Sequence, residues 1–140
     1  PICATTIKTM PHPGFPTDMQ PQFTAMLTLA GGTSVVTEGV WDNRFRYVDE
    51  LARMGANIQV DGKVAVVQGV ETLTGAPVKA TDLRAGAALM IAALMAKGTT
   101  EIEDIYHIER GYEDVVEKFR SLGAPIKRVE TPDLEIPAAL

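Results

Sequence analysis

The sequence is poor in several features that mark particular classes of protein. Its only cysteine, Cys3, cannot form an internal disulfide, and no ligand cluster has the spacing of a zinc site. Basic residues are in the minority, with 13 Lys and Arg against 18 Asp and Glu, which argues against a nucleic-acid binder. The longest apolar run, residues 85–96, has 12 residues, against about 20 for a membrane span. We therefore expect neither nucleic acid nor membrane as a partner, and a reduced, cytoplasmic setting.

What remains is a globular composition. The chain has 140 residues, of which 46% are hydrophobic and 22% charged. These values exclude disorder as the global state and fit one domain. The sequence starts at Pro1 without Met, a basic segment or a signal-peptide core. We therefore expect it to be a piece of a longer polypeptide.

The sequence contains two similar halves. Thr17-Asp18 and Thr81-Asp82 each open an apolar run, at an offset of 64 residues. Gly32-Thr33 and Gly98-Thr99 close these runs, at an offset of 66 residues. A period of about 65 residues is longer than the roughly 20 to 50 residues of common solenoid repeats. It indicates a duplicated supersecondary unit.

Each half has the pattern β-α-β-α-β-β. The first helix of a half begins with Thr at the N-cap and Asp in the first turn, and Thr17 to Gln20 fits a capping box. Its body is apolar on nearly every side, so it must be buried all round. In the first half, Asp61-Gly62 is a hairpin signal. The predicted helices are 18–31, 45–54, 82–97 and 112–122, and the predicted strands are 33–37, 56–60, 63–70, 76–80, 99–102, 126–130 and 134–136.

This pattern requires strands on the outside that wrap apolar helices on the inside. The fold class is therefore α/β, with two repeats of one domain, over about residues 11–70 and 76–136. Two copies leave the inner helices with an open side. We expect an apolar strip there, covered by self-association or another protein surface, with residues such as Phe23, Leu27, Leu89 and Leu94.

Four stretches, in the same order, resemble the enolpyruvyl transferases of cell-wall synthesis. They are Pro11–Gln20, Asp42–Phe45, Thr81–Arg84 and Tyr106–Glu113. The resemblance extends over about residues 7–129. It implies an inside-out α/β barrel of three such units per domain, of which residues 1–140 resemble the last two units of the second domain. It also implies that the reactive cysteine of the family lies outside this chain, so Cys3 is not a nucleophile.

The resemblance implies an activity that this chain would share with the rest of its polypeptide. Enolpyruvyl would pass from phosphoenolpyruvate to the 3-hydroxyl of UDP-N-acetylglucosamine in bacterial peptidoglycan synthesis, with no metal or organic cofactor. Because the chain would carry half of the site, we expect it to be inactive alone. Two alternatives remain: an enzyme similar to 3-phosphoshikimate 1-carboxyvinyltransferase, and a non-catalytic binding module on the same fold.

Asp18 has a simple structural interpretation and a functional one. As a carboxylate in a first helical turn it would stabilise the helix by about 0.3–1 kcal/mol. The resemblance implies instead that Asp18 is the base that acts at the sugar 3-hydroxyl, which makes it a catalytic residue. It also implies that Thr17, Asp18 and the backbone of Val40 contact the UDP-sugar.

Arg84 lies near the start of the second apolar helix, where a cation is unfavourable unless an anion joins it. It could form a surface salt bridge with Asp82, or its guanidinium could hold a phosphate or carboxylate group in a bidentate manner. The resemblance implies the second role. It further places Arg44, Asp82 and Arg110 at the phosphoenolpyruvate and phosphate site, and gives Arg110 a catalytic contact with enolpyruvate.

Overall fold

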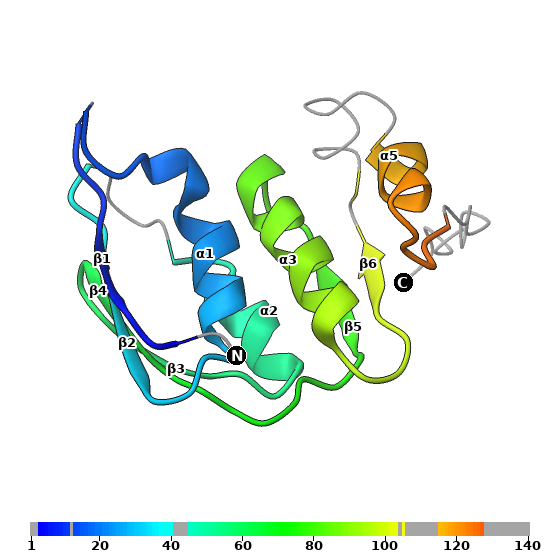
Figure 1. The fold of residues 1–140 in the computed structure, drawn as a ribbon, viewed down its shortest axis with the longest axis horizontal. Helices are drawn as coiled ribbons and strands as arrows, with labels where there is room; N and C mark the ends of the chain where they lie inside the picture. Colours follow the sequence, from blue (N-terminus) through cyan, green and yellow to red (C-terminus); the bar gives the residue numbers. More distant parts are fainter. Residues whose placement is uncertain (1–2, 12, 41–44, 104, 106–114, 128–140) are drawn as a thin grey trace, which may run out of the picture.

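Strands and helices alternate along the chain, as the sequence predicts (Figure 1). The computed structural model describes residues 3–11, 13–40, 45–103, 105 and 115–127. The elements are β1 (Thr6–Lys8), the 3-10 helix η1 (Thr17–Met19), α1 (Gln20–Leu27), β2 (Thr33–Thr37), α2 (Val48–Arg53), β3 (Asn57–Asp61), β4 (Val64–Gln68), β5 (Pro77–Lys79), α3 (Leu83–Met95), β6 (Glu101–Glu103) and α5 (Val115–Ser121).

The strands form two sheets, each built around a parallel pair. The first sheet has the order β1-β2-β4-β3, in which β1 and β2 are parallel and the β2-β4 and β3-β4 pairs are antiparallel. The second sheet is the parallel pair β5-β6. Helix α1 connects β1 to β2, and α3 connects β5 to β6. The α/β class is confirmed, and the β-α-β arrangement occurs once in each half.

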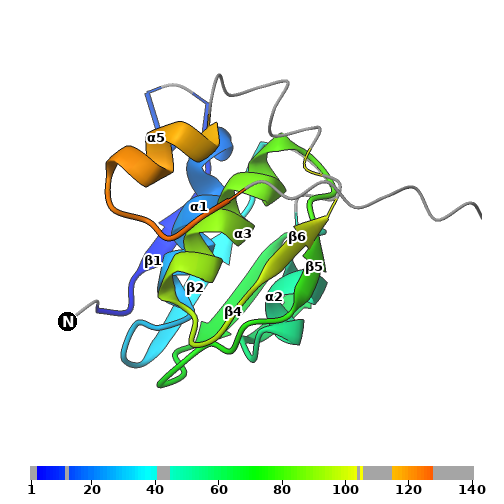
Figure 2. The ribbon, with the colours of Figure 1, turned by 90° about the vertical axis from the view of Figure 1, so that its right-hand side faces the viewer.

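Helices α1 and α3 lie side by side and run in the same direction, so their starts lie at the same end of the molecule (Figures 1 and 2). Leu27 of α1 packs on one face of the first sheet, against a row formed by Ile7, Val36 and Ala65 on neighbouring strands. On its other side α1 faces α3. The helix is therefore covered from two directions, as its apolar sequence requires.

A second group of buried residues joins the helices to one another. Small residues of α3, Ala85, Ala88 and Ala92, are at most 2% exposed, which lets the helix axes approach closely. Leu51 at α2 and Leu89 at α3 fill the space between these elements and are both 0% exposed. Truncation of such a buried leucine to alanine typically costs about 2–5 kcal/mol, so this cluster holds the two halves together.

The predicted helix caps are wrong in both halves. Thr17 was expected at an N-cap with a capping box to Gln20, but neither η1 nor α1 has a side-chain cap hydrogen bond. Both side chains bind Glu38 instead. In the second half the N-cap is Asp82, one residue after the predicted Thr81, and its Oδ1 accepts from the Ala85 amide at 2.8 Å. A neighbouring buried carboxylate thus outcompetes the local cap at Thr17.

The predicted apolar strip is only partly present. Leu94 is 46% exposed, but Leu27 and Leu89 are at most 4% exposed, so their assignment to the strip is wrong. Phe23 is partly buried and meets Phe15 edge to face at 5.1 Å. The two inner helices and the first sheet already cover one another, which explains the difference. Self-association through Leu94 stays a prediction.

Several strand predictions agree with the structure. Strand β2 has the predicted bounds, and Gly62 has a φ of 59° in the β3-β4 hairpin. Residues 124–127 are described and form no strand, while 128–130 and 134–136 lie outside the described residues. Strand β1, of three residues, was not located from the sequence because so short an element has no measurable periodicity. No helix in the described part of the chain is long and apolar enough to cross a membrane.

The segment after β4 contains a glycine that tolerates no side chain, because it passes close to the turn after α1. A Cβ built on Gly69 would lie 1.7 Å from the carbonyl oxygen of Ala30, whereas a Cβ on nearby Gly31 would meet nothing within 4 Å. We expect Gly69→Ala to lower the free energy of unfolding by about 1–3 kcal/mol, because backbone must move to admit the methyl group. Urea unfolding measures this, with Gly31→Ala as the matched control, which should change it by about 0.5 kcal/mol or less. Equal losses in the two variants would contradict the close approach of these segments.

Candidate functional site

The predicted site residues that the structure describes lie at one end of the fold. They follow the carboxyl ends of the parallel strands: Thr17-Asp18 come after β1, Val40 after β2, and Asp82 and Arg84 after β5. Thr17 and Asp18 lie in η1 directly before α1, and Asp82 and Arg84 lie at the start of α3; the starts of the two helices are at the same end of the molecule (Figure 1). In sheets with parallel strands and crossover helices, ligands bind outside the carboxyl ends of the strands. The topology therefore gathers residues that lie far apart in the sequence.

Asp18 and Arg84 form an ion pair between the two halves of the chain. The Arg84 Nε lies 2.7 Å from the Asp18 Oδ1, with the Asp18 side chain 64% exposed and the Arg84 side chain 35% exposed. Arg84 is thus not paired with Asp82, and the surface salt bridge considered from the sequence is wrong in its partner. An ion pair this exposed stabilises a protein by about 1 kcal/mol or less. A ligand anion can therefore replace it at little cost.

The two equivalent aspartates have different roles. The Asp82 carboxylate caps α3, because one of its oxygens accepts a hydrogen bond from the Ala85 amide. The Asp18 carboxylate makes no cap hydrogen bond to its own helix. Asp18 does lie in the first turn of η1, where a negative charge suits the helix dipole, and its carboxylate, with the side chain 64% exposed, is also open to a substrate.

Thr17 and Val40 are brought together by a buried carboxylate, that of Glu38, which is 1% exposed. The Thr17 hydroxyl donates to both carboxylate oxygens, at 3.0 and 3.1 Å. The Val40 amide donates to Oε1 at 3.2 Å. The predicted UDP-sugar contacts Thr17 and Val40 are thus neighbours in space, although 23 positions separate them in the sequence.

A second set of buried polar groups extends from Glu38 into the helices. The Gln20 amide donates to Glu38 Oε2 at 3.2 Å, and the Gln20 Oε1 accepts from the Tyr47 hydroxyl. Tyr47 is 2% exposed. Burial raises the pKa of the Tyr47 phenol well above its usual range, and the negative charge of Glu38 adds to the effect, while a hydrogen bond with Thr24 opposes it. Tyr47 therefore stays neutral and acts as a donor.

Sequence reasoning missed Glu38, Gln20 and Tyr47 as members of this region. One signal was available: α1 carries Gln20, Thr24 and Thr28 among apolar residues, and all three are 0% exposed. Polar side chains inside an apolar helix require partners. The identity of those partners depends on the tertiary fold, because Glu38 and Tyr47 come from other elements.

Arg44 and Arg110 lie outside the described residues, so their predicted contacts with phosphoenolpyruvate stay predictions. Across the described ranges, no three His, Cys, Asp or Glu side chains come together as metal ligands would. The chemistry that the described part of the site offers is one exposed carboxylate, one guanidinium, and backbone and hydroxyl groups held by Glu38.

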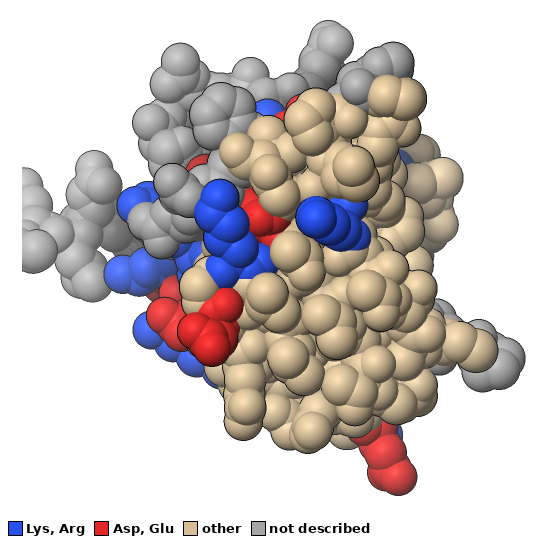
Figure 3. All heavy atoms as spheres, turned by 90° about the vertical axis from the view of Figure 1, so that its left-hand side faces the viewer, with Lys and Arg blue, Asp and Glu red and all other residues tan. Residues whose placement is uncertain are grey.

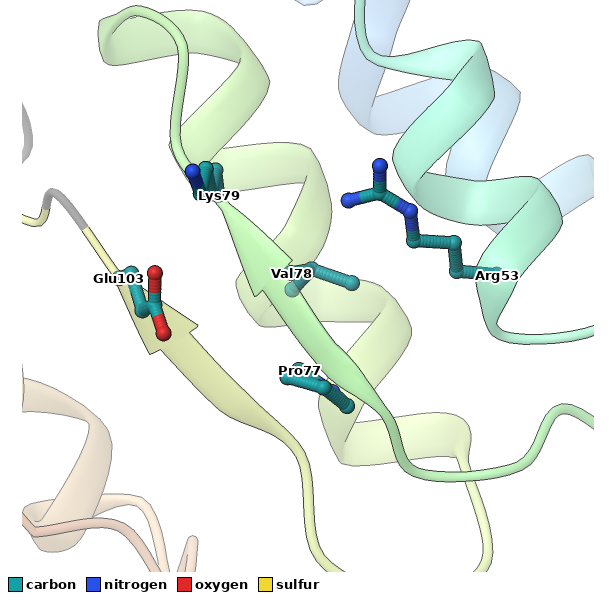
Figure 4. A pocket seen from close by; sticks show the side chains of 5 residues that line it. All are labelled: Arg53, Pro77, Val78, Lys79 and Glu103. Carbon is teal, nitrogen blue, oxygen red and sulfur yellow. The ribbon is translucent and has the colours of Figure 1, made fainter.

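A hollow of about 250 Å³ lies elsewhere on the surface. Figure 4 shows its lining, with Arg53 on α2 opposite Pro77, Val78 and Lys79 of β5, and Glu103 on β6. The Arg53 guanidinium binds Glu50 at 2.8 Å. The lining of this hollow includes both signs of charge and none of the predicted site residues. We therefore do not assign the candidate site to it.

Charged side chains are unevenly spread over the surface. On the face of the first sheet that points away from the helices, most of the surface carries neither Lys and Arg nor Asp and Glu, and most of the charged side chains gather at one side (Figure 3). With a net charge of −5, the chain presents no broad basic face in this view.

The buried phenol gives the protein a specific alkaline sensitivity. The pKa of Tyr47 is raised in the folded state above its ordinary value of 10.0, so its contribution to stability is present below about pH 10 and is lost as the pH rises further. We expect the free energy of unfolding to fall as the pH rises above about 10, and Tyr47→Phe to remove part of this fall. Urea unfolding at several pH values measures it. The same slope in both proteins would show that Tyr47 is not buried as described.

Comparisons with known proteins agree with this geometry. Residues 1–119 match the family described as EPSP synthase (3-phosphoshikimate 1-carboxyvinyltransferase). The chain is 62% identical over 123 residues to UDP-N-acetylglucosamine 1-carboxyvinyltransferase 1 of Clostridium perfringens, covering 88% of this chain and 29% of the relative. It is 55% identical over 130 residues to UDP-N-acetylglucosamine 1-carboxyvinyltransferase of Desulfatibacillum aliphaticivorans, covering 93% of this chain and 31% of that relative.

Solved structures give the same result for the fold. The crystal structure of the enolpyruvyl transferase NikO from Streptomyces tendae superposes with a TM-score of 0.84 at 35% identity, over 94% of this chain and 30% of that one. EPSP synthase from Acinetobacter baumannii superposes with a TM-score of 0.56 at 21% identity, which concerns the fold alone. The chain spans about three tenths of the length of these relatives. The inside-out α/β fold expected from the sequence is thereby supported.

Proposed function

The chain belongs to the EPSP synthase (3-phosphoshikimate 1-carboxyvinyltransferase) family, and we propose that it forms part of a UDP-N-acetylglucosamine 1-carboxyvinyltransferase. Such an enzyme transfers enolpyruvyl from phosphoenolpyruvate to the sugar 3-hydroxyl. The observation that carries the proposal is the meeting of Asp18 and Arg84 across the two halves, a potential base beside a potential anion clamp. The identity of 55–62% to relatives of that name favours a UDP-sugar over shikimate 3-phosphate as the acceptor.

Enolpyruvyl transfer has two requirements that these residues meet in part. The sugar oxygen must lose its proton as it bonds to C2 of phosphoenolpyruvate, and a proton must reach C3; loss of phosphate and of a C3 proton then restores the alkene. A carboxylate such as Asp18 can accept the hydroxyl proton. Cationic groups must hold the phosphate and carboxylate of the donor, and Arg84 suits this because its guanidinium forms bidentate pairs with both. The remaining acid would come from outside this chain.

The ion pair of the free protein fits this order of events. Without ligand, Arg84 binds Asp18 at 2.7 Å. When Arg84 binds the donor anion, the Asp18 carboxylate loses its partner and becomes available to the sugar hydroxyl. Asp82, which caps α3, keeps Arg84 at the start of that helix. We assign Thr17, Asp18 and Val40 to the UDP-sugar, and Arg44, Asp82, Arg84 and Arg110 to phosphoenolpyruvate and phosphate.

The proposal extends to the setting of the reaction. A nucleotide sugar and phosphoenolpyruvate are both phosphorylated metabolites, which do not cross membranes unaided. We therefore place the reaction in the bacterial cytoplasm, as a step of peptidoglycan synthesis. The non-catalytic binding module has no specific observation in its favour.

The first test is activity with and without the remainder of the enzyme. We expect a full-length transferase that carries this segment to release phosphate from phosphoenolpyruvate only when UDP-N-acetylglucosamine is present. The 140-residue chain alone should show no turnover, since it spans about 30% of the length of its relatives. A phosphate-release assay measures both proteins. Release that depends on shikimate 3-phosphate instead would contradict the proposed acceptor, and turnover by the chain alone would show that the other part is dispensable.

The second test concerns Asp18. In the full-length transferase, Asp18→Ala should lower kcat by about 10²–10⁴, which is typical for loss of a positioned base. Its free energy of unfolding should change little, because the carboxylate is mostly exposed and caps no helix. Asp49→Ala, at an exposed aspartate in the first turn of α2, is the matched control and should keep full activity. A stable Asp18→Ala enzyme with normal kcat would remove Asp18 from the catalytic role.

A further inference from the structure

Glu38 is the most deeply buried acidic residue of the described chain, and it accepts hydrogen bonds from several segments. It directly follows β2 and is 1% exposed. Donors in the described part of the chain are the Thr9 hydroxyl at 2.6 Å, the Thr17 hydroxyl at 3.0 and 3.1 Å, the Gln20 amide at 3.2 Å and the Val40 backbone amide at 3.2 Å. A carboxylate offers about four acceptor positions on its two oxygens, so these donors occupy most of the acceptor positions of Glu38.

The donors come from the segments of the first half that form the substrate end. Thr9 follows β1, Thr17 begins η1, Gln20 begins α1, and Val40 lies in the loop after β2. Glu38 therefore joins segments that the covalent chain brings together only through long connections. Because a buried charge without its donors is strongly unfavourable, their positions are coupled to its own.

The loop after β2 is shaped for this arrangement. A Cβ on Gly39 would lie 2.2 Å from the carbonyl oxygen of Thr9, so only glycine permits the close approach. The Gly39 amide donates to the Thr9 Oγ1 at 2.7 Å, while the same hydroxyl donates to Glu38. The hydroxyl is thus fixed as acceptor on one side and donor on the other, which holds residues 38–40 against the end of β1.

From these contacts we propose that Glu38 is a positioning residue for enolpyruvyl transfer, which holds Thr17 with the adjacent Asp18 and the Val40 amide in one fixed arrangement. The inference rests on the proposed function, because it assigns a purpose to groups that the proposal places against the UDP-sugar. Glu38 itself touches no reacting atom. It acts by fixing the base Asp18, whose own carboxylate is 64% exposed and has no cap hydrogen bond to hold it.

The network behind Glu38 orients its partners. The Tyr47 hydroxyl donates to the Gln20 Oε1, which turns the Gln20 Nε2 toward Glu38. Thr24 donates to the carbonyl of Gln20 at 2.9 Å. Each donor in this series of hydrogen bonds faces an acceptor only if the side chain at position 38 accepts hydrogen bonds on both of its oxygens. An amide at position 38 would present NH₂ to groups that are donors, which makes Glu38→Gln the sharpest substitution.

The test compares two buried glutamates in a full-length transferase that carries this segment. Glu50 is 7% exposed and accepts from Arg53 and from the Lys79 amide, neither of which is a predicted site residue. We expect Glu38→Gln to lower kcat/KM for UDP-N-acetylglucosamine by about 10- to 100-fold, the scale of a small misplacement of catalytic groups. Glu50→Gln should lower the melting temperature as well but leave kcat/KM within about twofold. Glu38→Asp, which keeps the charge, should restore part of the activity.

Hydrogen exchange of the peptide containing residues 17–20 provides a readout independent of activity. Exchange there should be faster in Glu38→Gln than in the wild type, and unchanged in Glu50→Gln. If Glu38→Gln fails to accumulate as folded protein, Thr9→Val removes one donor and is judged by the same measurements.

The outcomes separate the two proposals. Normal kcat/KM in Glu38→Gln, or an equal loss in Glu50→Gln, would overturn the positioning role. A wild-type enzyme that transfers no enolpyruvyl would overturn the proposed function. The exchange data would then decide the positioning role, because unchanged exchange at residues 17–20 in Glu38→Gln would overturn it, and faster exchange confined to that variant would support it.

Discussion

The parallel packing of α1 and α3 is the constraint on which the rest of the structure depends. Both helices are apolar on most of their surface, so neither can face water along its length. They bury these faces against each other and, for α1, against the first sheet. Since each helix connects two parallel strands, its direction is fixed by its sheet. Packing the helices side by side therefore brings the carboxyl ends of both strand pairs to one end of the molecule.

This arrangement explains why a site can form from residues with no local relation to one another. Asp18 lies before α1 and Arg84 within the first turn of α3, and the contact between them exists only because the two helix starts are neighbours. The short side chains of Ala85 and Ala88 permit that proximity, since each is at most 2% exposed at the interface. A bulkier residue there would separate the helix starts as well as disturb the core. Packing and function are thus linked through the same contact.

More of the fold than of the candidate site could be predicted from the sequence. The repeat, the strand at 33–37 and the hairpin at Asp61-Gly62 follow from periodicity, β-branched residues and turn chemistry, which are local properties. The caps predicted at Thr17 and Thr81 are wrong, and for Thr17 the reason lies outside the local sequence, because its partner Glu38 comes from another element. The burial of Leu27 and Leu89 was missed for the same reason. Periodicity shows that a face is apolar but not which element covers it.

The pairing of Asp18 with Arg84, as opposed to that of Asp82 with Arg84, also needed the tertiary structure. In a sequence the nearest opposite charge is the natural partner, and Asp82 is two residues from Arg84. In the structure Asp82 caps α3 instead, because the first amides of a helix lack partners within the helix and a carboxylate can accept from them. The resemblance to a family pointed to Asp18, Asp82 and Arg84 together, and the geometry shows that the two aspartates have different partners.

The two halves use equivalent residues in different ways. Equivalent Thr-Asp pairs precede the two inner helices, yet only Asp82 caps its helix. In the first half, Glu38 holds the threonine, and the following aspartate is left without a structural partner in its own helix. A carboxylate that caps a helix is engaged and oriented for stability, whereas one that does not can exchange partners. The duplicated unit thus supplies the same residue twice: Asp82 caps its own helix, and Asp18, which we propose as the base, pairs instead with Arg84 of the other half.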